Sequence, residues 1–335
     1  MKIAIFGAGS IGVYIGGSLL ASGAEAVLVG RARMRQQIAR EGLLLTDLAG
    51  LRMQLAAADV PYAESAAALA DADLILVTVK SADTPAAATE IAAHAKPSAL
   101  IISLQNGVGN ADTLRQALPG RTILGGMVPF NVAQMAGSRF HRATGGELAI
   151  EASPELRAWT TVFRAAHLPL QESQDFPSIQ WGKLLLNLNN SVNALSDLPL
   201  KAELSQRAYR RCLALLIEEA LLLLREAGIR PAKIARVRPQ LLPTLLRLPD
   251  ALFKRLAATM LKIDPEARSS MWEDLHGGRR TEVDYLNGAI VRLAESFGRD
   301  APANRRITAL IHGAEGLAPR PLSGEALYRT LQAGS

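Results

Sequence analysis

Residues 2–12 read KIAIFGAGSIG, and this stretch decides the fold. The apolar run Lys2–Phe6 is followed directly by three glycines with GxGxxG spacing, and a helical pattern begins at residue 11. In this order the glycines allow a tight turn, a close approach of the backbone to a pyrophosphate, and packing of the helix on the strand. The phosphates meet N–H groups at the helix N-terminus. We therefore predict a dinucleotide site formed by Gly7, Ala8, Gly9, Ser10, Ile11 and Gly12.

The same alternation continues outward from this loop. Further strands are predicted at residues 26–29, 74–79, 99–103 and 122–124, and helices at residues 84–95 and 110–117. Residues 145–150 read as a later, antiparallel strand of the sheet. From residue 176 onward nearly every segment has helical periodicity, and the prolines between residues 231 and 265 require short helices there. We predict an α/β fold class: an N-terminal Rossmann-type doubly wound sheet (1–171, the dinucleotide-binding domain) followed by an all-helical C-terminal domain (172–335, expected to provide substrate binding and catalysis).

Arg31 stands where the second strand ends, at the position that decides which dinucleotide binds. NAD-specific sites usually place an acid there to accept a hydrogen bond from the ribose 2′-hydroxyl. A guanidinium instead pairs with a 2′-phosphate, and Arg33 and Arg35 add positive charge nearby. The sequence predicts NADPH as the cofactor; the alternative is a solvated arginine.

Two polar residues follow later strands of the sheet. Lys80 ends the apolar run 74–79, and Asn106 lies in QNGVG after the strand 99–103. Ligands of open α/β sheets bind beyond the carboxyl ends of the strands. We predict that Lys80 and Asn106 bind cofactor and that Asn106 also reaches the substrate, although a lysine after a strand and an Asn-Gly turn are each unremarkable alone.

The helical half carries a polar stripe and an acidic helix start. Lys183, Asn187 and Ser191 recur every four residues and are predicted to share one face of a helix over residues 184–195. Because that face holds amides and serines but few charges, we expect it to line a wet cleft rather than bulk solvent. Glu282 is predicted to lead another helix, where its alternative role is a favourable charge in the first turn.

Composition excludes several other classes of protein. The formal charge is +6, but the arginines are scattered and aromatic residues make up only 4%, so we expect no nucleic-acid partner. The apolar runs are too short to span a bilayer, and we expect no membrane association. The five histidines lack metal-ligand spacing, which predicts no metal. A single cysteine, Cys212, is read as packing and suits a cytoplasmic location.

Taken together, the motifs resemble those of the ketopantoate reductases (2-dehydropantoate 2-reductases). GAGSIG, VTVK, QNGVG, WGKLLLN and SSMWEDLHGGRRTEVDYLNG occur in the order of that family's landmarks. The resemblance implies that Lys183 is the general acid, that Asn106, Asn187 and Ser270 bind substrate, and that Glu282 accepts hydrogen bonds from the substrate hydroxyl. We count Asn131 and Glu282 among the cofactor-binding residues as well.

The resemblance has two departures that concern the substrate. Ser191, which we count among the substrate-binding residues, replaces a second asparagine common in the family, and its shorter side chain leaves room for a different or larger acyl group. The segment MVPFN at residues 127–131 also differs from the best-known members of the family. The leading hypothesis is NADPH-dependent reduction of 2-dehydropantoate to (R)-pantoate, in pantothenate and coenzyme A biosynthesis. The alternatives are reduction of another branched 2-oxo acid and a non-catalytic NADP(H)-sensing protein. The apolar faces of the helical half leave a homodimer open.

Overall fold

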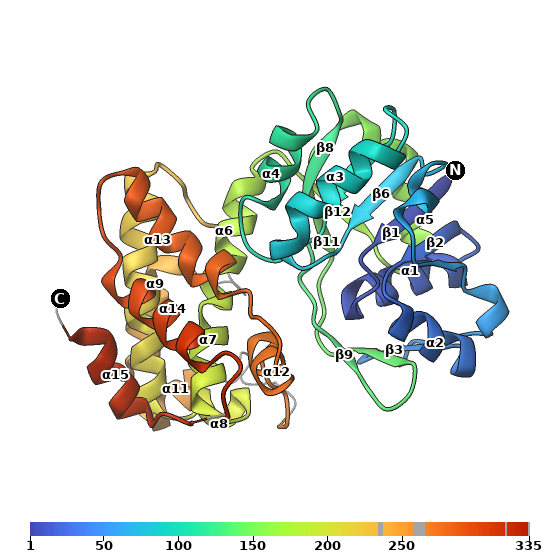
Figure 1. The fold of residues 1–335 in the computed structure, drawn as a ribbon. Helices are drawn as coiled ribbons and strands as arrows, with labels where there is room; N and C mark the ends of the chain where they lie inside the picture. Colours follow the sequence, from blue (N-terminus) through green and yellow to red (C-terminus); the bar gives the residue numbers. More distant parts are fainter. Residues whose placement is uncertain (234–236, 257–264, 319, 334–335) are drawn as a thin grey trace. The chain divides into compact units, whose positions relative to one another are not determined.

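The computed structural model describes residues 1–233, 237–256, 265–318 and 320–333. Contacts divide the chain into two compact units, Met1–Phe176 and Pro177–Ser335 (Figure 1). The boundary predicted after residue 171 lies within β12 (Leu170–Ser173), the last strand of the first unit.

The first unit is built on one large, mostly parallel sheet. Its strands run in the order β12-β11-β8-β7-β6-β1-β2-β5, and only β11 and β8 pair in the antiparallel sense. Their bounds are β1 (Lys2–Phe6), β2 (Glu25–Val29), β5 (Tyr62–Ala63), β6 (Leu74–Val77), β7 (Leu100–Ser103), β8 (Ile123–Met127) and β11 (Leu148–Glu151). The predicted Rossmann-type sheet is confirmed, and so is the antiparallel strand that follows it.

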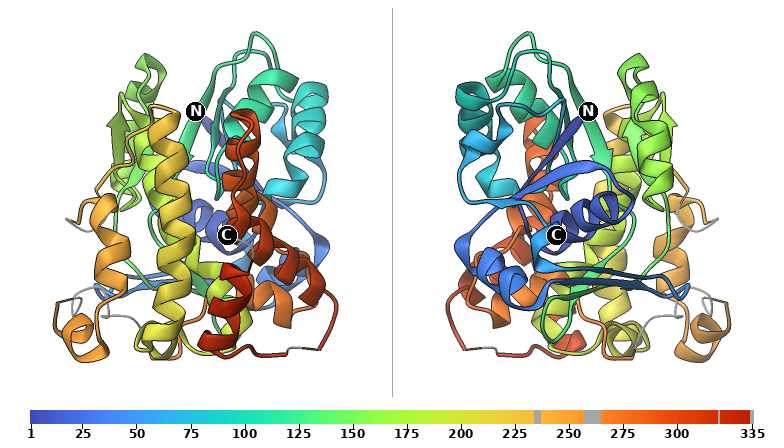
Figure 2. Two further views of the ribbon diagram at one scale, coloured as in Figure 1. Left: turned by 90° about the vertical axis from the view of Figure 1, so that its left-hand side faces the viewer. Right: turned by 90° about the vertical axis from the view of Figure 1, so that its right-hand side faces the viewer.

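Helices cover both faces of this sheet (Figures 1 and 2). Ile3 and Ile5 of β1 belong to the core that contains α1 (Ser10–Ala21), whereas Ala4 belongs to the core of α3 (Thr84–His94) and α4 (Asn110–Ala117). This division follows from the alternation of side chains along a strand. Two buried layers therefore hold the strand that leads into the glycine loop.

A second, four-stranded sheet was not predicted. It has the order β4-β3-β10-β9, with β3 (Leu43–Asp47), β4 (Arg52–Leu55), β9 (Val132–Gln134) and β10 (Arg139–Arg142). Helix α1 is packed between the two sheets. A Cβ added at Gly16 would lie 2.3 Å from Leu28, and one added at Gly17 would lie 2.6 Å from Leu43. The Gly16-Gly17 pair inside a helix was the sequence signal for this second layer.

The second unit is helical, as predicted, and is organised around α9 (Arg207–Glu226). The predicted helical periodicity holds in α9, where the apolar residues spaced three and four apart, Leu213, Leu216, Ile217, Ala220 and Leu224, are buried, while Leu221 is only partly buried. The remaining helices are α6 (Phe176–Asn187, which begins at the end of the first unit), α7 (Asn189–Ser196), α8 (Leu200–Leu204), α10 (Leu242–Leu246), α11 (Asp250–Leu256), α12 (Ser270–His276), α13 (Asn287–Ser296), α14 (Pro302–Ala314) and α15 (Gly324–Gln332). Helices α10 and α11 are short, as the prolines require; residues 234–236 and 257–264 of that stretch lie outside the described residues.

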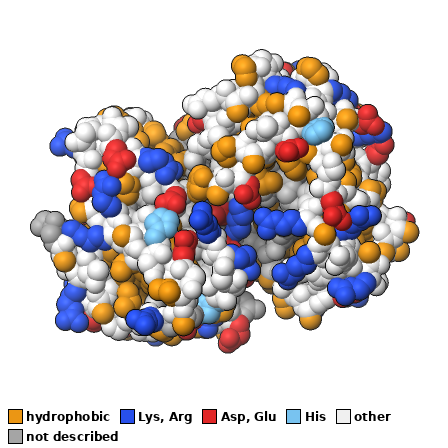
Figure 3. Space-filling model, in the orientation of Figure 1, with side chains coloured by type: hydrophobic (Ala, Val, Ile, Leu, Met, Phe, Trp, Pro, Cys, Tyr) orange, Lys and Arg blue, Asp and Glu red, His pale blue; other side chains and the backbone are white. Residues whose placement is uncertain are grey.

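Three further features concern the cysteine, the character of the helices and the surface charge. Cys212 is buried in α9, and burial raises the pKa of its thiol to about 12, which fits packing rather than nucleophilic chemistry. None of the described helices combines the length and the apolar character that a membrane span requires. On the face drawn in Figure 3, acidic and basic side chains are interspersed on each unit.

Candidate active site

The carboxyl ends of four parallel strands meet at one edge of the first unit. Phe6 of β1 is in register with Val29 of β2 and with Val77 of β6, and Val77 is in register with Ser103 of β7. The glycine loop, Arg31, Lys80 and Asn106 each follow one of these strands. The sheet therefore brings the predicted cofactor residues of these four segments to the same edge.

The glycine loop has the backbone that its sequence predicts. Gly7 has φ +120°, and a Cβ there would lie 2.5 Å from the backbone nitrogen of Val79. A Cβ on Gly12 would lie 2.1 Å from Gly7 O, so both positions require glycine. Sequence reasoning missed Thr78, whose hydroxyl donates to Gly7 O at 2.7 Å and fixes the turn from the neighbouring strand.

The middle glycine faces open space. No heavy atom lies within 4 Å of a Cβ built on Gly9, which is the N-cap of α1. No side chain among the described residues caps this helix end, and its first turn holds no acid. The orphan N–H groups and the helix dipole favour an anionic group at this point. The loop residues therefore fit a dinucleotide pyrophosphate.

Arg31 is available to a ligand. It is the N-cap residue of α2 (Ala32–Glu41), its side chain is 89% exposed, and its guanidinium is 3.8 Å from the carboxylate of Asp83. The hydroxyl of Tyr62 donates to Arg31 O at 3.1 Å and holds the backbone in place. Arg35, in contrast, pairs with Glu64 at 3.0 Å, so part of the predicted extra positive charge is already neutralised.

The loops that carry Lys80 and Asn106 are linked by a hydrogen-bond network that the sequence did not show. The hydroxyl of Ser81 donates to Asn106 O at 3.1 Å, and the side-chain amide of Asn110 donates both to Asn106 O and to Ser81 Oγ. The network continues through further side chains in this edge, namely Ser103, Gln105 and Thr84. It fixes the loops after β6 and β7 to each other, which positions Lys80 at the start of one loop and Asn106 in the other.

Asn131 lies in the segment between β8 and β9. Its side chain is exposed, while its backbone N–H donates to Thr144 Oγ1 at 2.9 Å and its carbonyl accepts from Ala143 N at 2.9 Å. These bonds hold the backbone and leave the amide side chain accessible at the surface.

In the second unit, Lys183 and Glu282 interact electrostatically. Lys183 is partly buried on α6, and burial lowers the pKa of its ammonium to about 8, against the opposing influence of the Glu282 carboxylate. The preceding Gly182 allows the segment at Ala232 to lie close to α6. A Cβ added at Gly182 would lie 3.1 Å from Ala232 O, and Ala232 N–H donates to Ser178 O. The site thus holds a cation that can release its proton near neutral pH.

The predicted single helix over residues 184–195 is wrong. It is interrupted at Leu188, so that Lys183 and Asn187 belong to α6 and Ser191 to α7. Ser191 is fully buried and its hydroxyl donates to Leu188 O at 3.0 Å, three residues back in its own backbone. The three residues are spaced four apart, as predicted, but they lie on two helices. The Ser191 hydroxyl bonds to the turn that joins those helices.

Glu282 does not lead a long helix, contrary to prediction. It precedes a single 3-10 turn, η6 (Val283–Tyr285), and α13 begins only at Asn287. The segment is held by Thr281, whose N–H and hydroxyl both donate to Glu315 Oε1 at 2.8 Å. The backbone next to Glu282 is therefore held in place by the carboxylate of Glu315, which is 33 residues further along the chain than Glu282. Local periodicity cannot reveal a contact over that separation.

Ser270 is the first residue of α12 and its side chain is exposed. The residue before it, Ser269, caps the helix by accepting the Trp272 N–H at 3.1 Å. The Ser269 hydroxyl therefore caps the N-terminus of α12, and the Ser270 hydroxyl remains accessible at the same helix end.

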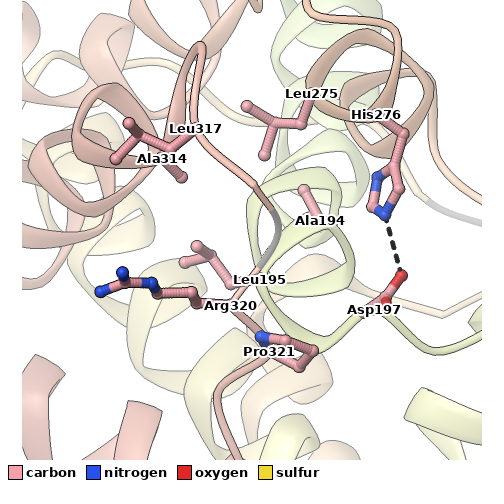
Figure 4. Close-up of a pocket in the computed structure, with 9 residues that line it drawn as sticks. All are labelled: Ala194, Leu195, Asp197, Leu275, His276, Ala314, Leu317, Arg320 and Pro321. Atoms are coloured by element: carbon pink, nitrogen blue, oxygen red, sulfur yellow. Dashed lines mark ion pairs between the residues drawn. The ribbon is translucent and has the colours of Figure 1, made fainter.

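A small pocket in the second unit lies apart from these residues (Figure 4). Its walls are mostly apolar and come from the end of α7, from α12 and from the chain after α14; they include Leu195, Leu275 and Leu317. None of the predicted site residues lines it. Among the described residues no group of three or more His, Cys, Asp or Glu side chains could hold a metal ion.

Comparison with known proteins places these features in one family. The model described as "Ketopantoate reductase PanE/ApbA" matches residues 3–155, and its C-terminal counterpart matches residues 175–315. A 2-dehydropantoate 2-reductase from Pyrococcus abyssi is 29% identical over 324 residues, covering 95% of this chain and 99% of the relative. The crystal structure of a PanE/ApbA family ketopantoate reductase from Ralstonia eutropha JMP134 is 33% identical, with a TM-score of 0.79 over 94% of this chain and 98% of that one. The ternary structure of D-mandelate dehydrogenase with NADH and anilino(oxo)acetate is 22% identical, with a TM-score of 0.75 over 94% and 98%, and shows a shared fold.

Proposed function

Since the chain belongs to the ketopantoate reductase family, oxidoreductases that act on a 2-oxo acid, we propose that it reduces 2-dehydropantoate to (R)-pantoate with NADPH. This reaction is a step of pantothenate and coenzyme A biosynthesis. The observation that carries the proposal is Lys183, an ammonium group with a pKa near 8 that interacts electrostatically with the Glu282 carboxylate. The glycine loop and the neighbouring strand ends, which fit a dinucleotide, also support the proposal.

The cofactor would be held by the first unit. The open approach at Gly9 and the uncapped end of α1 fit the pyrophosphate, and the exposed guanidinium of Arg31 fits a 2′-phosphate. Lys80, Asn106 and Asn131 complete the set in that unit, and Glu282 is proposed as a further contact. When bound, the nicotinamide supplies the hydride.

Lys183 supplies the proton. Hydride addition to the carbonyl carbon of a 2-oxo acid leaves negative charge on the carbonyl oxygen, and the ammonium both stabilises that charge and donates a proton to it. A pKa near 8 keeps Lys183 mostly protonated at pH 7, while its proton is given up more easily than from an ordinary lysine. Glu282 accepts the hydrogen bond of the resulting hydroxyl.

The substrate is bound by neutral polar groups. The Asn187 amide and the exposed Ser270 hydroxyl bind the substrate without adding another charge, and Asn106 contributes an amide from the first unit. Because the Ser191 hydroxyl is already bonded to Leu188 O, we propose that this position contributes room rather than a hydrogen bond. Reduction of another branched 2-oxo acid, with a different or larger acyl group, is therefore the main alternative within the same type of reaction.

A substrate panel tests the proposal. The purified protein is assayed with 2-dehydropantoate and other branched and aromatic 2-oxo acids, with NADPH and NADH in parallel. We expect the highest kcat/KM with 2-dehydropantoate and NADPH. Equal or better turnover of another acid would move the assignment to that acid, and binding of NADPH without turnover of any acid would favour the sensing protein.

A further inference from the structure

The end of α12 that carries Ser270 is tied to α7 by buried hydrogen bonds. The backbone N–H of Ser269 donates to Asn193 Oδ1 at 2.9 Å, and the Ser269 hydroxyl donates to Asn190 O at 3.2 Å. Both Ser269 and Asn193 are buried. These bonds set the place where α12 begins and hence the place of Ser270.

Asn193 is itself held by a buried acid. Its side-chain amide donates to Leu198 O at 2.9 Å and to Glu203 Oε2 at 3.2 Å, and the amide of Asn189 donates to the same carboxyl oxygen at 3.0 Å. Glu203, on α8, has no solvent exposure. A continuous chain of contacts therefore runs from Glu203 through Asn193 to Ser269.

Two other oxygens of this cluster lack a hydrogen-bond donor. Glu203 Oε1 and Asn189 Oδ1 are both buried and have no hydrogen-bond partner among the described residues. When Glu203 is ionised, both atoms can only accept hydrogen bonds. Among the described residues, no cation forms an ion pair with Glu203. The titratable neighbours it influences are Tyr209 and Cys212, which are not cations. A proton on Glu203 turns one of the two acceptors into a donor.

Burial acts in the same direction. It raises the pKa of Glu203 to about 8, although the amide donors of Asn189 and Asn193 oppose the shift. An unpaired carboxylate without solvent is costly, whereas a neutral carboxyl group is tolerated at far lower cost.

We propose that Glu203 is a protonated, neutral positioning residue that acts through Asn193 to fix the Ser270 end of α12 for substrate binding. The inference rests on the proposed function of Ser270. Helix α12 has separate attachments, since Trp272 Nε1 donates to Asp197 Oδ1 at 2.7 Å, and His276 Nε2 lies 3.2 Å from the same oxygen (Figure 4). Loss of the Asn193 bond therefore loosens the backbone at Ser269 and Ser270 and leaves the attachments of Trp272 and His276 in place.

Four variants test this chain of contacts. Glu203→Gln keeps an oxygen acceptor for both asparagines and supplies an N–H where the protonated acid has its O–H, so we expect the KM of the wild type. Asn193→Ala and Glu203→Leu break the chain, and we expect each to raise the KM for the 2-oxo acid about tenfold with a smaller change in kcat and an unchanged KM for NADPH. Tyr209→Phe is the control, because it removes only the partly buried hydrogen bond to Leu322 O, and we expect a lower Tm with an unchanged KM.

Amide hydrogen exchange of residues 269–272 gives a second readout that needs no turnover. We expect faster exchange there in Asn193→Ala and Glu203→Leu than in the wild type, Glu203→Gln or Tyr209→Phe. A raised KM or faster exchange in Glu203→Gln would overturn the neutral state, and unchanged exchange in Asn193→Ala would overturn the positioning role. If the wild type reduces no 2-oxo acid, the proposed function fails, and the exchange data still decide whether Glu203 holds α12. If exchange responds as expected but the KM does not, the link to substrate binding is refuted.

Discussion

At the scale of single residues, Lys183 meets two opposing demands. As the proposed general acid, Lys183 must keep its proton until hydride has been added to the carbonyl carbon, yet burial on α6 disfavours the charged form. The Glu282 carboxylate partly offsets the cost of burial, and the net result is a pKa near 8. The residue is therefore both useful and destabilising at neutral pH.

The first prediction concerns the pH profile. If protonated Lys183 is the general acid, kcat/KM is level below about pH 8 and falls with rising pH above it, because the protonated fraction is lost. Lys183→Ala is expected to lower turnover at least about a hundredfold while NADPH binding, measured by fluorescence titration, persists. The exposed Lys201 on α8 is the matched control, and Lys201→Ala should keep both turnover and profile. Retained turnover in Lys183→Ala would exclude this lysine as the acid.

The second prediction concerns stability at the same residue. The pKa of Lys183 falls from its ordinary value of 10.5 in the unfolded chain to about 8 in the fold. Between these values the unfolded chain binds more protons, so the free energy of unfolding rises with pH across that window, and the full cost is present below pH 8. Lys183→Met should raise Tm at pH 7 by a few degrees and have less effect at pH 10. An equal gain at both pH values would mean that the lysine charge is not the cause.

The third prediction tests the proposed role of Arg31 in the preference for NADPH over NADH. Arg31→Ala should raise the KM for NADPH about tenfold, because a charge-assisted contact with the 2′-phosphate is lost, and should leave the KM for NADH nearly unchanged. Arg40→Ala, an exposed arginine at the far end of α2, is the control. A similar loss for both cofactors would assign Arg31 a role in folding rather than in recognition.

At the scale of elements, α1 is the piece on which the first unit depends. It supplies the N-terminus of the proposed phosphate site and lies between the two sheets, with Gly16 against the large sheet and Gly17 against the small one. Glycine is a poor helix former, so two in succession are explained by the close approach of strands on both sides.

The fourth prediction follows from this packing. Gly17→Ala should destabilise the protein by about 1–3 kcal/mol, because the new methyl group would lie 2.6 Å from Leu43 and 2.9 Å from Leu45. Gly313→Ala in α14 is the matched control: a Cβ there meets nothing within 4 Å, and the change should stabilise the protein by about 0.4–1 kcal/mol. Urea denaturation of both variants measures the difference, and equal effects would refute the close-packing argument.

At the scale of the whole molecule, the cofactor is expected to stabilise the fold by mass action. A ligand at 100 times its Kd adds about 2.7 kcal/mol to the free energy of unfolding. The fifth prediction is therefore a larger rise in Tm with NADPH than with an equal concentration of NADH, measured by differential scanning fluorimetry. The difference should vanish in Arg31→Ala; if NADH gives the larger shift in the wild type, the proposed cofactor is wrong.

The homodimer stays a prediction at this scale. Several large apolar side chains are exposed on the helical unit, among them Leu222 on α9 and Leu256 on α11. Analytical ultracentrifugation of the full chain decides between monomer and dimer.

The sequence by itself determined the parts that depend on local order. The glycine loop, the strands around it and the helical second half follow from residue type and periodicity within short windows, and the ordered motifs were enough to identify the family. Lys80 and Asn106 could be placed at one edge because parallel strands in a Rossmann sheet end together.

Only the tertiary structure decided the rest, because the partners are far apart in the chain. The second sheet pairs β3 with β10, across more than ninety residues. Thr78 fixes Gly7, Glu315 holds the segment of Glu282, and Glu203 reaches Ser269 through Asn193. The interruption at Leu188 and the burial of Ser191 likewise arise from packing that no local window contains. Local propensity sets which elements form, whereas burial and long-range hydrogen bonds set which side chains remain available for chemistry.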